Sequence, residues 1–357
     1  MDMKRLFEKF EQKMTSLNRS RYISKEIKKR VSFLKMYGIP IKKLSETQKD
    51  EVRKVYKNKV KDFSTYELIY SIKGEFNPYI FPEKLHFSKF DLILNDKKTC
   101  HVWSDKNYAN KFFPQVKFPV AIVRNIHGNY YDAEYRLITR EEAIEKVSKY
   151  SKVCIKPSVG CSGQGVSLVD VEQSLENEFK NRKSNYIVQE VLEQYEPLKR
   201  LNPTSVNIVR ICSVFLNGRV SVVSATLRCG AVGAFNDNSI TADGKGMFVV
   251  KVDLQDGKLS DVGYYSCGVS LDKAPNGEMF AGIQLPNFEK ALKIVTDMHS
   301  QMPFATFVGF DMAFDINGEP TVMEYNLTAP GVFYYQLVSG PIFGNRTQEI
   351  LDKYYNN

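Results

Sequence analysis

The sequence predicts an α+β fold preceded by a helical N-terminal region. Apolar residues recur at helical spacing through residues 1–72, with charged residues between them. From about residue 99, short runs rich in β-branched residues alternate with polar turns and helical segments. These segments do not repeat as regular strand–helix–strand units, so antiparallel sheets are expected. The 357 residues suffice for two or three packed subdomains.

The N-terminal region is predicted to contain three amphipathic helices. The apolar stripe of the first consists of Met3, Leu6, Phe7, Phe10, Met14 and Leu17. The second covers roughly residues 22–36 and ends before Gly38 and Pro40, which are helix breakers. The third begins after Ser45, whose spacing to Gln48 fits a capping box.

Positive charge is concentrated in this helical region. Residues 1–62 hold 19 Lys and Arg against 8 Asp and Glu, and the rest of the chain holds 31 against 33. A basic excess confined to one region gives no reason to expect a nucleic-acid partner. Packing on the rest of the fold is favoured for the second and third helices. For residues 1–20, such packing and peripheral contact with an anionic membrane or an acidic partner both remain open.

No targeting or membrane-spanning segment is expected. The sequence has no apolar run of 18 or more residues. Charged residues interrupt residues 1–10, where a signal peptide would be apolar. The six cysteines form no Cys-x-x-Cys pair, and we expect reduced, mostly buried thiols. A cytoplasmic protein is therefore expected, with membrane association left open.

Strands are predicted from apolar, β-branched runs along the rest of the chain. They cover residues 166–170, 186–192, 207–216, 220–227, 247–254, 307–316 and 320–327. Helices are expected near residues 104–113, 140–150, 171–182, 287–301 and 346–355. The pairs Asn217-Gly218 and Asn317-Gly318 are typical of tight hairpin turns.

A glycine-rich loop follows an apolar strand that ends in Lys156. Glycines stand at positions 160, 163 and 165, and a second apolar strand follows. Glycines let backbone N–H groups approach an anion closely, and the lysine adds a point charge. The loop is neither a Walker A motif nor the glycine motif of dinucleotide folds, because no helix follows it directly. A hairpin that covers phosphates is therefore predicted, with a plain surface hairpin as the alternative.

Gln189 and Glu190 end an apolar strand. A nucleotide base requires an apolar slot with a few fixed donors and acceptors, and this pair fits that requirement. An ordinary strand end is the alternative.

Three oxygen-bearing side chains are predicted to converge on one hairpin near the C-terminus. Glu324 and Asn326 are two residues apart on a strand, so they point to the same face. The turn at residues 317–318 brings them across from Asp311 on the preceding strand. Carboxylates without His or Cys favour Mg²⁺, and burying them beside apolar residues without a cation is costly. A magnesium site is predicted, with a polar surface hairpin as the alternative.

Two arginines lie within predicted strands. Arg210 and Arg228 each interrupt an apolar run, and an arginine on an inner face needs an anionic partner. That partner is either a bound phosphate or carboxylate, or an acidic side chain of the same sheet.

In this order, these pieces resemble the ATP-grasp superfamily and, within it, the sugar-transfer-associated ATP-grasp proteins of bacterial surface-polysaccharide biosynthesis. The motifs that carry the resemblance are Asp105-Lys106, the Lys156-Pro157 glycine loop, Gln189-Glu190, Ser205-Val206-Asn207 with Arg210, Leu227-Arg228-Cys229-Gly230, Asp237-Asn238, Gly309-Phe310-Asp311 and Glu324-Tyr325-Asn326. The resemblance covers residues 45–345 and implies two α+β subdomains that enclose ATP. The implied division is a basic helical region 1–72, a linker subdomain 73–150, a flap subdomain 151–192 and a metal-binding subdomain 193–357.

The resemblance also implies a role for each site residue. The phosphate-contacting lysines are Lys106 and Lys156, and the flap consists of Gly160, Ser162, Gly163 and Gly165. The adenine and ribose contacts are Gln189, Glu190, Leu192 and Glu193, with Glu196 as a rival for the ribose. Asp311, Glu324 and Asn326 would hold two Mg²⁺ ions, and Arg210 and Arg228 would contact phosphate and the acyl-phosphate. Asp237 and Asn238 would lie in a loop near the acceptor.

The implied activity is that of a carboxylate–amine ligase that works through an acyl-phosphate. Lys156, Arg210 and Arg228 are its expected catalytic residues. Its expected substrates are a carboxylate and an amine in a sugar or polysaccharide precursor. A peptide-type ligase, a kinase-like variant and a non-catalytic nucleotide-binding module remain alternatives. Residues 272–277 replace a His-Pro pair common in the family, so acceptor identity is not implied. Gln164 stands where a flap lysine is common, so one flap charge is missing while the two phosphate-contacting lysines remain.

Overall fold

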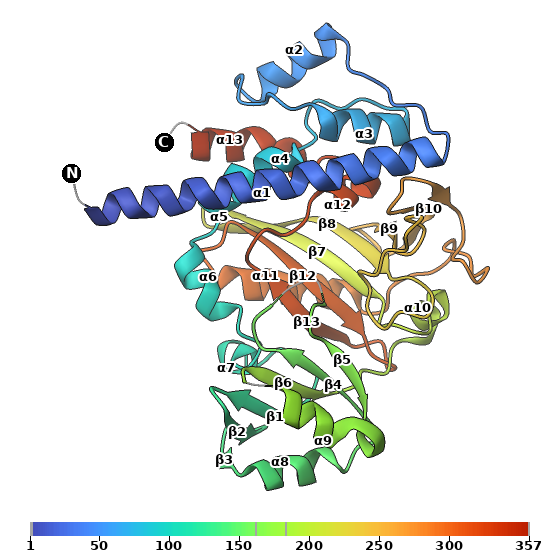
Figure 1. Ribbon diagram of the computed structural model, residues 1–357. Helices are drawn as coiled ribbons and strands as arrows, with labels where there is room; N and C mark the ends of the chain where they lie inside the picture. Colours follow the sequence, from blue (N-terminus) through green and yellow to red (C-terminus); the bar gives the residue numbers. More distant parts are fainter. Residues whose placement is uncertain (1–2, 161–162, 183, 356–357) are drawn as a thin grey trace.

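The computed structural model describes residues 3–160, 163–182 and 184–355. Two antiparallel sheets follow one another along the long direction of the molecule, and a layer of helices covers the end farther from the smaller sheet (Figure 1). The predicted α+β fold with a helical N-terminal region is confirmed.

The smaller sheet has six strands in the order β3-β2-β1-β6-β4-β5. Their bounds are β1 (Ala121–Ile126), β2 (Asn129–Asp132), β3 (Leu137–Ile138), β4 (Lys152–Pro157), β5 (Ser167–Asp170) and β6 (Tyr186–Glu190). Helices α8 (Arg140–Val147) and α9 (Val171–Asn181) cover one face and form a core with it. The opposite face of the smaller sheet points toward the larger sheet (Figure 1).

The larger sheet has seven strands in the order β11-β10-β9-β8-β7-β12-β13. Their bounds are β7 (Ile208–Leu216), β8 (Arg219–Cys229), β9 (Phe248–Val252), β10 (Leu259–Tyr265), β11 (Ser270–Leu271), β12 (Phe307–Phe314) and β13 (Pro320–Asn326). Side chains alternate between the faces. Val209 and Ile211 pack with α11 (Phe288–Ser300) in one core, and Cys212 and Val214 face the helical layer in another.

The helical layer combines both ends of the chain. Its members are α1 (Met3–Met36), α2 (Glu46–Val55), α3 (Ser64–Lys73), α4 (Glu83–Leu85), η1 (His86–Phe90), α5 (Asp91–Leu94), α12 (Phe333–Ser339), η2 (Gly344–Arg346) and α13 (Thr347–Tyr355). We call these elements the helical module. They share one hydrophobic core with β7 and β12, so the module is packed on the larger sheet. The short helices α6 (Lys97–Trp103), α7 (Ala109–Phe112) and α10 (Glu196–Leu201) lie outside it.

The N-terminal helix differs from its prediction. We expected two helices, and the structure has one helix of 34 residues, α1. Ile23 and Ile27 in its second half are buried, whereas Phe10 and Met14 in its first half are exposed. At about 100° per residue, these two apolar stripes lie on nearly opposite sides of the helix. The apolar pattern therefore changes side without a break in the backbone.

Some of the other predicted helix and strand boundaries are confirmed and others are wrong. The capping box is confirmed, because Ser45 caps α2 and Gln48 returns the hydrogen bond. The left-handed turn at Asn217 and Gly218 is confirmed by their positive φ angles of 53° and 74°. The predicted helix at 104–113 is wrong, since α6 ends before it and only α7 lies within it. The prediction also missed strands β1, β2, β3, β10 and β11.

Asp91 connects the helical module to the chain directly after β13. Its buried carboxylate accepts a hydrogen bond of 2.6 Å from Arg19 and lies 2.9 Å from the Lys97 ammonium. It also accepts a 2.7 Å bond from the backbone N–H of Ala329. Ala329 has a φ of 47°, which a residue with a Cβ holds only when its surroundings fix it. The module therefore sets the path of the segment that follows β13.

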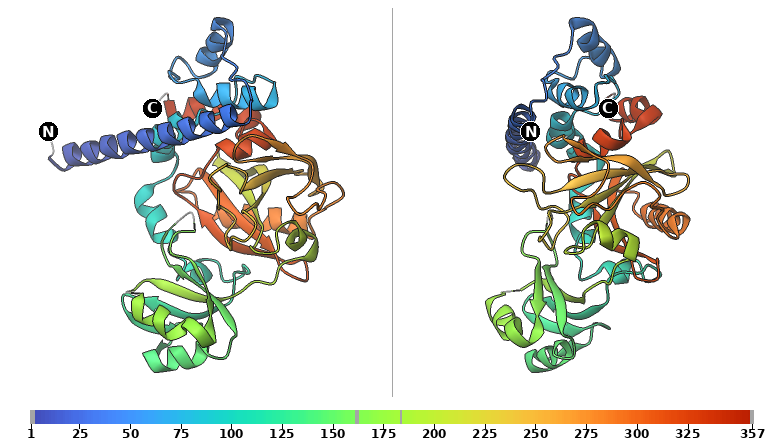
Figure 2. Two further views of the ribbon diagram at one scale, coloured as in Figure 1. Left: turned by 45° about the vertical axis from the view of Figure 1, so that its right-hand side comes forward. Right: turned by 90° about the vertical axis from the view of Figure 1, so that its right-hand side faces the viewer.

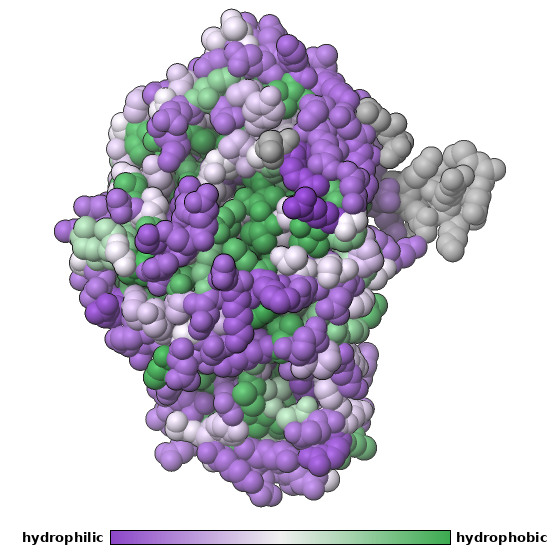
Figure 3. Space-filling view, turned by 180° about the vertical axis from the view of Figure 1, so that it is seen from behind, coloured by the Kyte–Doolittle hydropathy of each residue, from purple (hydrophilic) through white to green (hydrophobic). Residues whose placement is uncertain are grey.

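The described surface carries no bilayer-spanning element. No helix of residues 3–160, 163–182 and 184–355 is both long and apolar enough to cross a membrane. Seen from behind, hydrophilic side chains cover most of the surface, and hydrophobic ones gather near its middle (Figure 3). Within the described residues, five cysteines are unpaired and four of them are buried, as expected; Cys161 lies outside these residues.

A buried histidine predicts acid sensitivity. Burial lowers the pKa of His299 from 6.5 to about 4. Between these values the unfolded chain takes up a proton that the folded chain does not, so the free energy of unfolding falls as pH falls. The full loss is on the order of 3 kcal/mol. Urea midpoints at pH 7 and pH 5 capture part of this loss, and His299→Gln is expected to reduce the dependence; buried His86, whose pKa burial also lowers to about 4, accounts for a remaining part. His101→Gln, an exposed control, is expected to leave the dependence unchanged; equal slopes for both variants contradict the account.

Candidate active site

A cavity lies where the two sheets meet. It has about 380 Å³ of empty space, and its lining combines apolar side chains such as Phe118 and Met323 with Lys106, Lys156 and Glu324. A larger hollow, with about 1020 Å³ of empty space, lies beside α6 and α13 and contains none of the predicted site residues. Of the predicted site residues, Lys106, Lys156, Gln189 and Glu324 line the smaller cavity, and Asp311, Asn326, Arg210 and Arg228 do not.

Two lysines reach this cavity from different elements. Lys156 is on β4, and its side-chain ammonium makes no hydrogen bond or ion pair with any described residue. Burial lowers the pKa of its ammonium, and the nearby Lys106 charge adds to the lowering. The Lys106 ammonium lies 3.5 Å from a Glu324 oxygen and donates a 3.1 Å hydrogen bond to the Gly160 carbonyl. An anion in the cavity would meet two positive charges.

The glycine loop connects β4 to β5, and the Gly160 carbonyl at its start accepts a hydrogen bond from Lys106. Gly163 and Gly165 both have a φ of 70°, in the left-handed region that favours glycine. A Cβ at Gly165 would lie 2.9 Å from the Pro157 ring. The backbone N–H of Lys106 donates to Ser158, so the start of the loop is tied to the site. The predicted flap residue Ser162 lies outside the described residues.

Of the residues predicted to contact the base and the ribose, Gln189 lines the cavity and the others do not. Gln189 lines the cavity, donates a 3.1 Å bond to the Pro119 carbonyl, and has a buried amide oxygen without a partner among the described residues. Glu190 accepts a 3.0 Å bond from the Tyr150 hydroxyl. Leu192 and the exposed Glu193 follow β6, Glu196 begins α10, and none of the three lines the cavity.

The predicted metal ligands form a row across neighbouring strands. In the sheet register, Asp311 stands opposite Arg210 on β7 and opposite Glu324 on β13. Asn326 stands opposite Gly309, so all three oxygen-bearing residues share one face of the hairpin, as predicted. A Cβ at Gly309 would lie 3.0 Å from a terminal nitrogen of Arg210, so glycine leaves that side chain its place.

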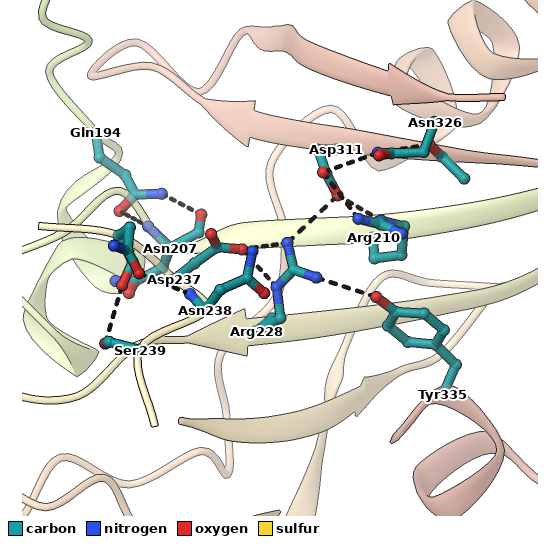
Figure 4. Close-up of polar contacts among 12 residues, drawn as sticks. Gln194, Asn207, Arg210, Arg228, Asp237, Asn238, Ser239, Asp311, Asn326 and Tyr335 are labelled. Atoms are coloured by element: carbon teal, nitrogen blue, oxygen red, sulfur yellow. Dashed lines mark hydrogen bonds and ion pairs between the residues drawn. The ribbon is translucent and has the colours of Figure 1, made fainter. Parts of the chain in front are cut away.

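Asp311 is the centre of a buried charge network (Figure 4). Both of its oxygens accept hydrogen bonds from Arg210, one of them at 2.9 Å, and Arg228 lies 3.7 Å away. Asn326 donates its amide to Asp311 at 3.1 Å. Burial alone would raise the pKa of Asp311, but the two arginines outweigh burial and lower it. The carboxylate is therefore held ionised.

Arg228 makes the second ion pair of the network, with Asp237. Its Nη1 also donates a 3.0 Å hydrogen bond to the Tyr335 hydroxyl on α12 (Figure 4). We predicted either a bound anion or an acidic side chain as the partner of each arginine. In the structure the partners are the acidic side chains of Asp311 for Arg210 and Asp237 for Arg228. Asn238 is next to Asp237 in the same loop, where its N–H donates to Asn236.

The oxygen atoms of the three predicted ligands are of the kind that Mg²⁺ binds. Asp311, Glu324 and Asn326 offer two carboxylates and, because the Asn326 amide nitrogen is already engaged, one amide oxygen. No group of three or more His, Cys, Asp or Glu side chains suited to a metal occurs in the described part of the chain. Mg²⁺ typically takes one or two carboxylates and completes its shell with water and substrate phosphates. The residues fit such a shared site and do not form a closed protein cage.

Sequence reasoning singled out Asn207 but missed its partner Gln194 and the arginine partner Tyr335. Tyr335 lies in a helix whose aromatic run gives no positional signal. Gln194 and Asn207 exchange two hydrogen bonds, of 2.6 Å and 2.9 Å, and so fix the chain just before β7 (Figure 4). Polar residues this buried become visible only once the strands are placed.

The family model described as sugar-transfer associated ATP-grasp matches residues 87–352. No curated protein matches the chain. Among solved structures, the VanG D-Ala:D-Ser ligase of Enterococcus faecalis matches over 73% of this chain and 63% of its own, at 16% identity and a TM-score of 0.46. Phosphoribosylamine–glycine ligase of Thermotoga maritima matches over 77% and 61%, at 13% identity and 0.45. A biotin carboxylase domain of Hydrogenobacter thermophilus, solved with MgADP, matches over 68% and 46%, at 11% identity and 0.39.

The chain spans less than two thirds of the length of each of these three solved proteins. These identities and TM-scores are too low to assign the chain to a family, so the assignment rests on the family model alone.

The buried pair of Arg210 and Asp311 predicts strong energetic coupling. Removing one partner leaves the other charge buried and unpaired, so Arg210→Met and Asp311→Leu are each expected to cost on the order of 3 kcal/mol. The double variant should cost less than their sum, as urea unfolding would show. The exposed pair Lys290 and Glu319 is the control, and its coupling should stay below about 1 kcal/mol. Additive losses at Arg210 and Asp311 would contradict the buried-network description.

Proposed function

Because the chain belongs to the sugar-transfer-associated ATP-grasp family, we propose that it is an ATP-dependent ligase that joins a carboxylate to an amine. One observation carries the proposal. Lys106, Lys156 and Glu324 meet in the cavity between the sheets, one strand away from the ionised Asp311. Positive charges for phosphates and oxygen ligands for a cation thus adjoin one another, which is what phosphoryl transfer requires.

The nucleotide is proposed to occupy this cavity. Lys106 and Lys156 bind the phosphates, and the Lys156 ammonium is available because no described residue is paired with it. The apolar wall at Phe118 and Met323 and the unpaired amide oxygen of Gln189 fit a base with an amino group. The loop of residues 158–166 is proposed to close over the phosphates and to exclude water.

Asp311, Glu324 and Asn326 are proposed to hold Mg²⁺ together with the phosphates. The metal supplies charge neutralisation at the transferring phosphoryl group. Asp311 remains ionised because Arg210 and Arg228 lower its pKa, and an ionised carboxylate is what a cation requires. Glu324 contacts Lys106, so the same carboxylate also orients a phosphate-binding lysine.

The proposed reaction has two steps. A carboxylate oxygen of the first substrate attacks the terminal phosphorus of ATP, the bond to the bridging oxygen breaks, and ADP leaves. The amine nitrogen of the second substrate then attacks the acyl carbon, the carbon–oxygen bond breaks, and inorganic phosphate leaves as the amine loses a proton. Arg210 and Arg228 stabilise the negative charge that develops in both steps.

The substrate class is proposed from the family description and is a sugar or polysaccharide precursor of cell-surface glycans. The loop that carries Asp237 and Asn238 is the proposed neighbour of the acceptor. A Cβ at Gly163 of the flap would lie 3.7 Å from the Asn236 side chain, so this loop and the flap border one space. A second substrate in that space would lie beside Arg228.

ADP release from purified protein tests the proposed activity. A panel of uronic acids and amino acids is offered with and without amines, and ADP is expected only when a suitable carboxylate and amine are both present. Glu324→Gln should lower kcat at least about 100-fold, because it removes a ligand charge at the phosphoryl group.

The matched control for this assay is Glu319→Gln. Glu319 is on the same hairpin but pairs with Lys290 at the surface, so its loss should leave turnover unchanged. ADP release without an amine, with the phosphoryl group recovered on the substrate and not as free phosphate, would indicate a kinase-like activity. Nucleotide binding without turnover for any pair would indicate a binding module and would overturn the ligase proposal.

A further inference from the structure

Helix α1 has a packed side and an outward side. Ile23, Ile27 and Leu34 are buried against the helical module, and Arg30 beside them pairs with the buried Glu83. At about 100° per residue these residues form one stripe along the helix. The first part of the helix extends past the rest of the module (Figure 2). The stripe therefore anchors only the second half of α1.

An apolar stripe runs along the outward side of the first half. Phe10, Met14 and Leu17 are 60%, 41% and 44% exposed. At about 100° per residue they lie roughly 110° to 170° from the centre of the packed stripe, so the helix presents them away from the side that packs on its own body. Large apolar side chains grouped on one projecting helix face are typical of an interaction surface.

The outward side becomes basic toward the C-terminal half of the helix. Arg21, Lys25 and Lys28 continue the line of the apolar stripe, all three are exposed, and none is ion-paired with any described residue. Glu11 and Glu26 lie roughly 100° and 160° around the helix from Phe10, outside this line. From residue 10 onward, the outward side is therefore apolar at Phe10, Met14 and Leu17 and positively charged at Arg21, Lys25 and Lys28.

This charge pattern selects among partners for the surface. In a parallel pair with the helix of a second copy, Arg21 and Lys28 would lie on the seam and face like charges, which is destabilising. Apolar residues beside unpaired lysines and arginines fit the boundary between anionic lipid headgroups and acyl chains. The family match begins at residue 87, so this surface lies outside it.

We propose that the outward side of α1 docks the protein on an anionic lipid surface. Phe10, Met14 and Leu17 enter the boundary between headgroups and acyl chains. Arg21, Lys25 and Lys28 contact the lipid phosphates. The proposal rests on α1 alone and does not require the ligase activity.

Vesicle sedimentation with the full chain tests the proposal. Vesicles of phosphatidylcholine alone are compared with vesicles that also contain phosphatidylglycerol. Binding to the anionic vesicles should be about tenfold stronger or more and should weaken in high salt. Phe10→Ser/Met14→Ser/Leu17→Ser should abolish binding, and Arg21→Gln/Lys25→Gln/Lys28→Gln should remove the preference for anionic vesicles.

Two control variants change the same chemistry elsewhere. Leu137→Ser removes an apolar side chain that is 69% exposed on β3. Lys152→Gln/Lys180→Gln/Lys199→Gln removes three exposed charges outside the helical module. Both controls should bind as the unaltered chain does, and circular dichroism should show every variant folded.

Equal binding to neutral and anionic vesicles would overturn the proposal, as would equal losses in the controls. A dimer without lipid, measured by light scattering and abolished by the apolar triple variant, would assign the surface to a second copy instead.

Discussion

The ion pair between Asp311 and Arg210 is the constraint on which the rest of the site depends. It joins the neighbouring strands β12 and β7 inside the larger sheet, where burial would otherwise favour a neutral carboxyl group. Isolated charges are costly in such a position, so each must have its partner. Arg228 and Asn326 complete the surroundings of Asp311, and Asp237 and Tyr335 complete those of Arg228. A cation at Asp311 would enter a network whose charges are already balanced. The network would then have to redistribute its hydrogen bonds, and the arginines would gain freedom to contact anionic substrate groups.

The helical module contributes to this site at a distance. It packs on the same face of the larger sheet that carries Arg210, and α12 supplies Tyr335 from within it. Asp91 holds the backbone at Ala329, three residues beyond Asn326. The side chain of His86 lies 3.0 Å from the Pro330 carbonyl, which adds a second tie to the same segment. Helix α1, whose Arg19 pairs with Asp91, is thereby part of the support of the site.

Local signals in the sequence sufficed for some elements and not for others. The capping box at Ser45 and the hairpin facing of Asp311 and Glu324 follow from spacing alone, because each depends on residues close in sequence. The reversal of the apolar side of α1 mimicked a helix break, since periodicity reports which side is apolar and not whether the backbone continues. Short strands such as β3 carry too few residues to show alternation. The roles of Asp91 and Tyr335 depend on partners 238 and 107 residues away in sequence, which no local pattern reveals.

The central claim is that Asp311, Glu324 and Asn326 bind a metal shared with nucleotide phosphates held by Lys106 and Lys156. Calorimetric titration with ADP, with and without Mg²⁺, tests it most directly. Mg²⁺ should tighten ADP binding to the unaltered chain. Glu324→Gln and Asn326→Ala should both lose that gain, Asn326→Ala should keep metal-free binding, and Lys156→Met should weaken binding in both conditions. An unchanged Mg²⁺ effect in Glu324→Gln and Asn326→Ala would contradict the claim.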